Sequence, residues 1–225
     1  MGNRRKTVRN NGFQLSPVIF FCNLSGKYQK KTNSERINMM QMKKKKPAVF
    51  LDRDGVIIEE KHYISKPEDV KLTYRAGEAV KMLSQNGFYT VVVSNQSGIA
   101  RGYFTLEDYH SVTHRMVELL ENEGAALDLI LYSPFHPEGK VAEYTRDSDC
   151  RKPGSGMFLQ AETELGIDME KSFMIGDRTS DIDAGKKLGL FSILVKTGYG
   201  ESSILPDKIC NNLYEAAHFI TGGKI

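Results

Sequence analysis

Two carboxylates near residue 50 have the spacing of a catalytic pair. Asp52 and Asp54 flank Arg53 and follow a short apolar run, Ala48-Val49-Phe50-Leu51. A carboxylate that attacks phosphorus forms an acyl phosphate, and a second carboxyl group can protonate the leaving oxygen and then activate water. The spacing leaves open which aspartate attacks. The competing interpretation is that both are solvated turn residues, which is the commoner role of such pairs.

Further polar side chains follow other apolar segments of the chain. Asp177, with Asp181 close behind, offers hard oxygen ligands of the kind that Mg2+ prefers. Ser94 and Asn95 supply a hydroxyl and a backbone amide, and Lys152 supplies a positive charge. Phosphoryl transfer needs such charge on its equatorial oxygens. Together these residue types favour a metal-assisted reaction at phosphorus.

The elements that must position these residues alternate between strand and helix. Strands are expected at 48–51, 88–93, 127–132, 173–175 and 191–195, and helices at 76–86, 105–124, 153–166, 180–188 and 213–220. This alternation predicts an α/β fold with a parallel sheet that is covered on both faces. Because ligands of such sheets bind beyond the carboxyl ends of the strands, the polar clusters are expected to share one site.

The charge of the chain is divided between a basic arm and an acidic body. Residues 1–46 carry 12 Lys/Arg and one acid, whereas residues 47–225 carry 19 Lys/Arg and 27 Asp/Glu. The arm could bind nucleic acid or an acidic membrane. We favour a disordered extension or an overlong start, so the domain is expected to span 47–225.

Two features of the sequence indicate the cellular compartment of the protein. The longest apolar run is Val18-Ile19-Phe20-Phe21-Cys22, which is too short to cross a bilayer. Three widely separated cysteines favour a reducing cytoplasm over a disulfide scaffold. We therefore expect a cytoplasmic protein without a membrane partner.

Four motifs in order resemble the haloacid dehalogenase (HAD) superfamily of phosphatases. They read FLDRDGV at 50–56, VSNQSG at 93–98, RKP at 151–153 and IGDRTSDI at 175–182. Through the string SNQSGIARG at 94–102, the chain is most similar to the D-glycero-D-manno-heptose 1,7-bisphosphate phosphatases. The histidinol-phosphate phosphatases share nearly all of these motifs. The resemblance covers about residues 48–200 and implies a three-layer Rossmann-like fold.

The resemblance also assigns roles to the acidic residues. It implies that Asp52 is the nucleophile and a ligand of Mg2+. Asp54 would be the general acid/base, with its backbone carbonyl also on the metal. Asp177 would complete the metal site, and Asp181 would support that site from behind without binding the ion.

Further roles fall on polar and basic residues. The resemblance implies that Ser94 and Asn95 hold the phosphoryl group and that Lys152 neutralises the nucleophile and the transferring phosphate. Arg151 resembles a residue that contacts the substrate, and we predict substrate contact for Arg101 as well.

The spacing of the motifs leaves no room for a separate cap domain. Only 39 residues separate Asp54 from Ser94, and they must already hold a flap and a helix. We therefore expect an open site whose specificity is set by three loops, at about 59–66, 99–104 and 133–149.

The third of these loops departs from the family pattern. Close relatives often carry a structural zinc there, held by a C-P-H-H-P … C-x-C pattern. Here Ser133 and Ser148 replace two cysteine ligands, Phe135 replaces a histidine ligand, and Cys150 remains. A structural zinc needs about four ligands, so we predict none and expect the loop to be ordered by packing of Phe135 and Tyr144.

These observations favour a Mg2+-dependent phosphatase of a sugar bisphosphate that works through an aspartyl phosphate. A D-glycero-D-manno-heptose 1,7-bisphosphate 7-phosphatase is the first hypothesis, and a histidinol-phosphate phosphatase is the second. A third, from another class, is a nucleic-acid-binding protein or nucleic-acid 3′-phosphatase that uses the basic arm; the catalytic set disfavours it. We expect a monomer or a weak homodimer.

Overall fold

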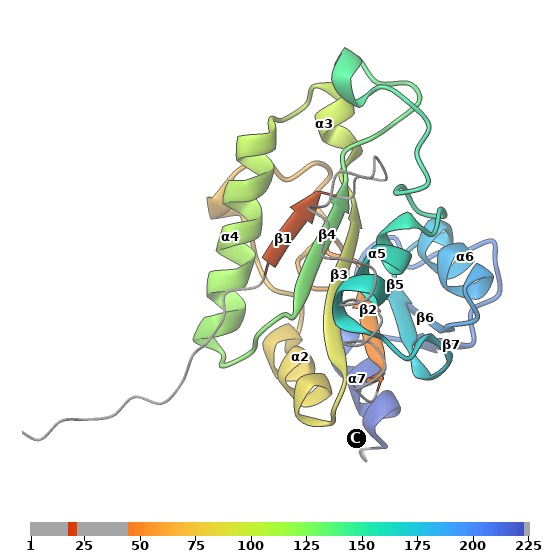
Figure 1. Cartoon of the computed structure of the whole chain (residues 1–225). Helices are drawn as coiled ribbons and strands as arrows, with labels where there is room; N and C mark the ends of the chain where they lie inside the picture. Colours follow the sequence, from red (N-terminus) through yellow and green to blue (C-terminus); the bar gives the residue numbers. More distant parts are fainter. Residues whose placement is uncertain (1–17, 22–44, 223–225) are drawn as a thin grey trace, which may run out of the picture.

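A seven-stranded parallel sheet forms the centre of the molecule (Figure 1). The computed structural model describes residues 18–21 and 45–222. The strand order is β1-β4-β3-β2-β5-β6-β7, and every neighbouring pair is parallel. The strands are β1 Val18–Phe21, β2 Ala48–Leu51, β3 Tyr89–Asn95, β4 Leu129–Ser133, β5 Phe173–Gly176, β6 Phe191–Val195 and β7 Lys208–Cys210.

Helices cover both faces of this sheet and complete three layers. The helices are α2 Ala76–Gln85, α3 Ser97–Arg101, α4 Leu106–Asn122, α5 Gly156–Leu165, α6 Thr179–Lys187 and α7 Leu213–Thr221. Helices α2, α4 and α7 pack on one face, and α5 and α6 on the other (Figure 1). The α/β architecture expected from the sequence is confirmed, and no separate cap interrupts residues 45–222.

Strand β2 shows why the sequences of the strands are continuously apolar and do not alternate with polar residues. Val49 and Leu51 belong to the core beneath α2, α4 and α7. Ala48 and Phe50 belong to the opposite core, where the Phe50 ring lies 4.9 Å from the ring of Phe158 on α5. All four side chains are fully buried. A strand that is buried on both faces has no polar position, which is typical of parallel sheets.

Local sequence sets most of the helix ends as expected, with one correction. Thr105 starts α4 with a capping box. Its hydroxyl accepts the backbone N–H of Asp108, and its own backbone N–H donates to the Asp108 carboxylate. The helix expected from Pro153 begins at Gly156 instead. The backbone of 152–155 is used in a turn, in which Ser155 N–H donates to the Asp149 carboxylate at 3.1 Å.

The amino-terminal arm requires a second correction. Residues 1–46 were expected to lie outside the domain, but Val18–Phe21 forms the edge strand β1 beside β4. In addition, the Lys45 ammonium lies 3.4 Å from the Glu162 carboxylate of α5. The rest of the arm, residues 1–17 and 22–44 with most of its basic side chains, lies outside the described residues, so its expected disorder stays a prediction.

The topology brings the polar strand ends together. The chain moves from β2 to β3 and β4 on one side, then returns to β5 on the other side of β2. Such a switch point opens a crevice at the carboxyl end of the sheet. Asp52, Asn95 and Asp177 stand at the ends of β2, β3 and β5, and they therefore meet at this crevice. Among the described residues, no helix is long and apolar enough to span a membrane.

Candidate active site

A buried lysine holds two of the carboxylates at the crevice. The Lys152 ammonium lies 3.0 Å from an oxygen of Asp52 and 2.7 Å from an oxygen of Asp181. It also donates to the Val93 carbonyl at 2.7 Å, so all three of its protons have partners. Burial lowers the pKa of Lys152, but the two carboxylates more than offset this and leave the pKa above its usual value. Lys152 is therefore a fixed cation beside Asp52.

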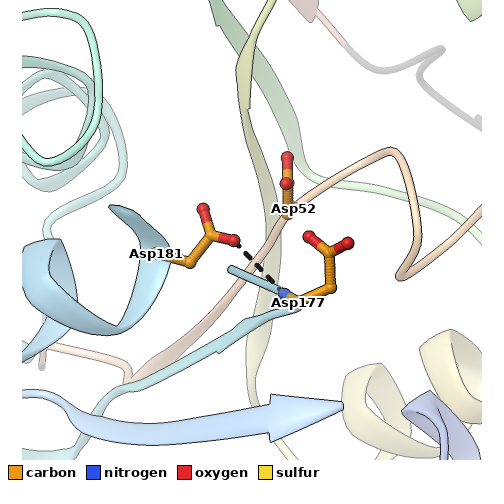
Figure 2. A group of neighbouring side chains, drawn as sticks. All are labelled: Asp52, Asp177 and Asp181. Carbon is orange, nitrogen blue, oxygen red and sulfur yellow. Dashed lines mark hydrogen bonds between the residues drawn. The ribbon is translucent and has the colours of Figure 1, made fainter. Parts of the chain in front are cut away.

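Three aspartates surround one point in this site. Asp52, Asp177 and Asp181 face one another from the end of β2, the end of β5 and the first turn of α6 (Figure 2). One oxygen from each lies within 4.8 Å of the others. The second Asp181 oxygen accepts the backbone N–H groups of Asp177 and Arg178, both at 3.2 Å. Asp181 thus fixes both Lys152 and the backbone of Asp177.

The three carboxylates outnumber the cation among them. Burial raises the pKa of Asp52 to about 8, and the charges of Asp181 and Asp177 add to this against the effect of Lys152. Burial, together with Asp181, raises the pKa of Asp177 to about 6. Excess negative charge at a buried site calls for either protons or a cation.

A divalent cation fits this donor set. The Oδ1 atom of Asp177 is buried and has no hydrogen-bond partner among the described residues, with the Arg178 Nε atom 3.7 Å away. Its Oδ2 atom accepts the Tyr199 N–H at 2.8 Å. Gly55 makes room beside it, because a Cβ there would lie 2.5 Å from Asp177 Oδ2. Carboxylate oxygens that converge in this way suit Mg2+, with Asp52 and Asp177 as the side chains that would hold it.

Asp54 is held apart from the other carboxylates by its own partners. The Arg53 guanidinium donates to both Asp54 oxygens at 3.1 Å. The Gln96 amide donates to Asp54 at 2.9 Å and to the Ser94 hydroxyl at 2.7 Å. The Asp54 side chain is about one-fifth exposed, so it can reach a molecule in the crevice.

Asn95 has a supporting contact that its residue type does not reveal. Its side-chain amide donates to the Lys152 carbonyl and accepts the Lys152 N–H, both at 2.9 Å. The pair of bonds ties the end of β3 to the segment before α5. Asn95 thus places the lysine beside Asp52, and it also lines the cavity above.

A cavity of about 150 Å³ opens over these groups. Its lining includes Asp52, Asp54, Lys152, Arg151, Arg178, Glu60, His62, Tyr63, Phe104 and Tyr199. Burial lowers the pKa of Arg151, and the nearby charges of Arg101 and Arg178 lower it further. Because Arg151 also has a buried NH1 group that no described residue hydrogen-bonds, this wall of the cavity suits an anion.

Arg101 is not among the described residues that line the cavity. It ends α3, and its guanidinium lies 2.9 Å from the Nε2 atom of His136. None of the residues described in the loop 133–149 lines the cavity, in contrast to the loop 59–66. The expectation that this third loop helps to set specificity stays a prediction, and such an effect would pass through neighbours such as Arg151.

The same loop is packed against the core. Phe135 is buried, and the Arg146 guanidinium lies 3.9 Å from its ring centre. Its ring centroid lies 6.5 Å from that of Tyr144. Cys150 is disulfide-bonded, so the expectation of reduced cysteines does not hold for it, whereas Cys210 is free and buried.

Two residues that line the cavity, Arg178 and Tyr199, have little signal in the sequence. Arg178 forms an ion pair with Glu60 and lies 3.7 Å from the ring centre of Tyr199, although these residues are far apart in the chain. The position of Arg178 directly after Asp177, at a strand end, was the available clue. Tyr199 belongs to a turn after β6 whose role depends on the fold.

The chain is similar to known proteins over most of its length. A model of HAD-hydrolase-like proteins matches residues 149–216. The D-glycero-D-manno-heptose-1,7-bisphosphate 7-phosphatase of Thermosynechococcus vestitus is 38% identical over 187 residues, which cover 78% of this chain and 95% of that protein. The D-glycero-beta-D-manno-heptose-1,7-bisphosphate 7-phosphatase of Yersinia pestis is 40% identical over 171 residues, or 74% and 91% of the two chains.

A solved structure shares both fold and sequence. The D,D-heptose 1,7-bisphosphate phosphatase from B. bronchiseptica, in complex with magnesium and phosphate, superposes with a TM-score of 0.70 at 25% identity. The superposition covers 78% of this chain and 98% of that protein.

Proposed function

Because this chain belongs to the D-glycero-D-manno-heptose-1,7-bisphosphate 7-phosphatase family of HAD-like hydrolases, we propose that it removes the 7-phosphate from a heptose 1,7-bisphosphate. The chain is a phosphatase, and Mg2+ fits its site. The observation that carries the proposal is the Asp52–Lys152 pair at the switch point of the sheet, beneath a cavity walled by arginines.

The first step is attack by Asp52 on the 7-phosphoryl group. One Asp52 oxygen forms a bond to phosphorus as the bond from phosphorus to the sugar oxygen breaks. Asp54 gives its proton to that leaving oxygen. The Lys152 ammonium would exchange its Asp52 contact for a phosphoryl oxygen, and the Ser94 hydroxyl would hold another. Mg2+ held by Asp52 and Asp177 would supply further positive charge there.

The second step releases phosphate and restores Asp52. Asp54, now a carboxylate, takes a proton from a water molecule that attacks the phosphorus of the aspartyl phosphate. The phosphorus–Asp52 bond breaks, and inorganic phosphate leaves. Asp54 ends the cycle protonated again, so one carboxyl group serves both steps.

The second phosphate of the substrate is assigned to the arginine wall. Arg151 and Arg178 line the same cavity as Asp52 and Lys152, and the Arg151 NH1 group has no hydrogen-bond partner among the described residues. A guanidinium matches a phosphate better than an ammonium because it presents a planar pair of donors. Arg101 would act indirectly, through its charge on Arg151.

The third loop is proposed to hold no structural zinc. Ser133 and Phe135 are buried there, and Cys150 is engaged in a disulfide. A zinc site needs about four suitable ligands, and the aligned positions do not offer them. Metal analysis of the purified protein that found one tightly held zinc per chain would refute this.

We further infer that the enzyme acts in the cytoplasm as a monomer or weak homodimer. The disulfide at Cys150 removes the support that the cysteines gave to this location, so the inference rests on the substrate. A doubly phosphorylated sugar does not cross a bilayer unaided, because burying its charges is too costly. Its phosphatase is therefore expected in the compartment where the sugar is phosphorylated. Sedimentation at several concentrations measures the oligomeric state, and a concentration-independent tetramer would contradict this inference.

The test is phosphate release from a panel of substrates with Mg2+ present. The panel holds both anomers of the heptose bisphosphate, histidinol phosphate and a 3′-phosphorylated oligonucleotide, with Asp52→Asn as the blank. We expect a strong preference for a heptose bisphosphate that Asp52→Asn abolishes. A preference for histidinol phosphate would overturn the proposed substrate, as would a salt-sensitive preference for the oligonucleotide.

A further inference from the structure

Arg53, between the two catalytic aspartates, is a buried cation that forms an ion pair with one carboxylate, Asp54, among the residues that the structure describes. It is 1% exposed. Its Nε atom donates to one oxygen of Asp54 and its NH2 group to the other, both at 3.1 Å. Two parallel bonds from a planar guanidinium to both oxygens fix the carboxylate in rotation as well as in place. Arg53 therefore sets the orientation of the Asp54 carboxylate.

A glutamine closes the same network from the end of β3. Gln96 is 4% exposed, and its carbonyl accepts from the Arg53 NH2 group at 3.1 Å. Its amide donates to Asp54 Oδ2 at 2.9 Å and to Ser94 Oγ at 2.7 Å. Gln96 thus links Arg53, Asp54 and Ser94, so that a shift of the guanidinium moves both groups.

Helix α4 anchors the arginine from behind. The Arg53 NH1 group donates to the hydroxyl of Thr113, which is fully buried, at 3.4 Å. The guanidinium carbon lies 5.3 Å from the ring centre of Tyr109 on the preceding turn. A cation at this distance from an aromatic ring is attracted to it. Contacts to helix α4 therefore help to determine where the guanidinium lies.

We propose that Arg53 is the positioning residue for the acid/base Asp54, with α4 as its fixed support. The proposal rests on the proposed function, in which Asp54 protonates the leaving oxygen. Burying a cation is costly, and here it is offset by Asp54, Gln96 and α4. What this arrangement provides is a carboxylate with a defined direction toward the crevice. Proton transfer requires such alignment at hydrogen-bond distance.

Leaving-group dependence separates this role from a purely structural one. A sugar alkoxide is a poor leaving group that needs a proton, whereas p-nitrophenolate leaves without one. The measured quantity is kcat/KM, because it reports the steps up to cleavage of the substrate and excludes hydrolysis of the aspartyl phosphate. Arg53→Lys keeps the charge but loses the two-pronged contact.

We expect Arg53→Lys to lower kcat/KM for the heptose bisphosphate by about 10²-fold, since general acids contribute that much or more. For p-nitrophenyl phosphate, the loss should stay within about 3-fold by the same reasoning. Equal losses on both substrates, or no loss on either, would overturn the proposal. Arg115→Lys is the matched control, because Arg115 pairs with Glu118 on the exposed side of α4; both substrates should be unchanged.

Two further variants distinguish failure of this inference from failure of the proposed function. Thr113→Val removes the hydroxyl that accepts from the Arg53 NH1 group, and it should show the same selectivity with a smaller loss even if Arg53→Lys fails to fold. Asp54→Asn tests the premise. If Asp54→Asn loses activity selectively on the sugar substrate while Thr113→Val and folded Arg53→Lys do not, this inference is wrong. If Asp54→Asn also shows no selectivity, the acid role in the proposed function is wrong.

Discussion

At the scale of single residues, Lys152 provides the positive charge that partly neutralises Asp52 and Asp181. Its ammonium lies between Asp52 and Asp181 and is almost fully buried. We expect Lys152→Met to lower kcat by about 10²–10³-fold, because removing one preorganised charge from a transition state has this effect. Removing one partner of a buried ion pair also costs about 3–5 kcal/mol of unfolding free energy.

Steady-state kinetics and thermal melting of Lys152→Met measure both effects. Lys71→Met, an exposed lysine in the segment before α2, is the control and should change neither. A Lys152→Met variant that keeps wild-type kcat would contradict the role assigned to this residue.

At the scale of elements, packing orders the loop 133–149 beside β4. Phe135 is buried in the core that also holds α5. We expect Phe135→Ala to lower the free energy of unfolding by about 3–5 kcal/mol, the usual cost of removing a buried phenyl ring. Leu205→Ala, at a side chain that is 84% exposed, should stay near zero. Denaturant melts compare the two variants, and a Phe135→Ala protein as stable as the Leu205→Ala protein would count against packing of the loop.

The elements also show what sequence could reveal. The amphipathic helix α4 and the short apolar strand β6 could be predicted because burial imposes their patterns, and the capping box of Thr105 marked a helix start. Strand β1 was missed because it stands alone within a basic, aperiodic segment, and α3 is too short to show a helical period. The start of α5 was placed too early because Pro153 suits a first helical turn but here belongs to a turn.

Residue identity predicted which polar groups meet at the crevice, because parallel strand ends share one edge of the sheet. It did not predict their pairing. The bonds between Asn95 and Lys152, or between Arg53 and Gln96, join positions that are 57 and 43 residues apart. Such pairs depend on side-chain directions in the folded protein. For the same reason, the sequence could not show that the Arg101 guanidinium contacts His136. Substrate contact was predicted for Arg101 without knowledge of this pairing.

At the scale of the whole molecule, metal binding and pH should be linked through stability. Burial raises the pKa of Asp52 to about 8 and of Asp177 to about 6, against 3.8 for ordinary aspartates. Between these values the metal-free folded state binds more protons than the unfolded state, so its stability falls as pH rises from about 4 to 8. Mg2+ replaces the protons and should remove this loss.

We therefore expect the rise in Tm on adding Mg2+ to be larger at pH 8 than at pH 5.5. Melting curves with Mg2+ or with a chelator at each pH measure it, and Asp177→Asn should reduce the difference. A rise in Tm that is the same at both pH values would contradict the linkage.

Phosphorylation of Asp52 is the step on which the proposed mechanism depends, and trapping that intermediate detects it. Asp54→Asn should still form the aspartyl phosphate from p-nitrophenyl phosphate, whose leaving group needs no proton, but should hydrolyse it slowly for lack of a base. We predict a burst of one p-nitrophenolate per chain and a phosphorylated peptide that contains Asp52. A steady release without a burst, or label on any other residue, would contradict the account.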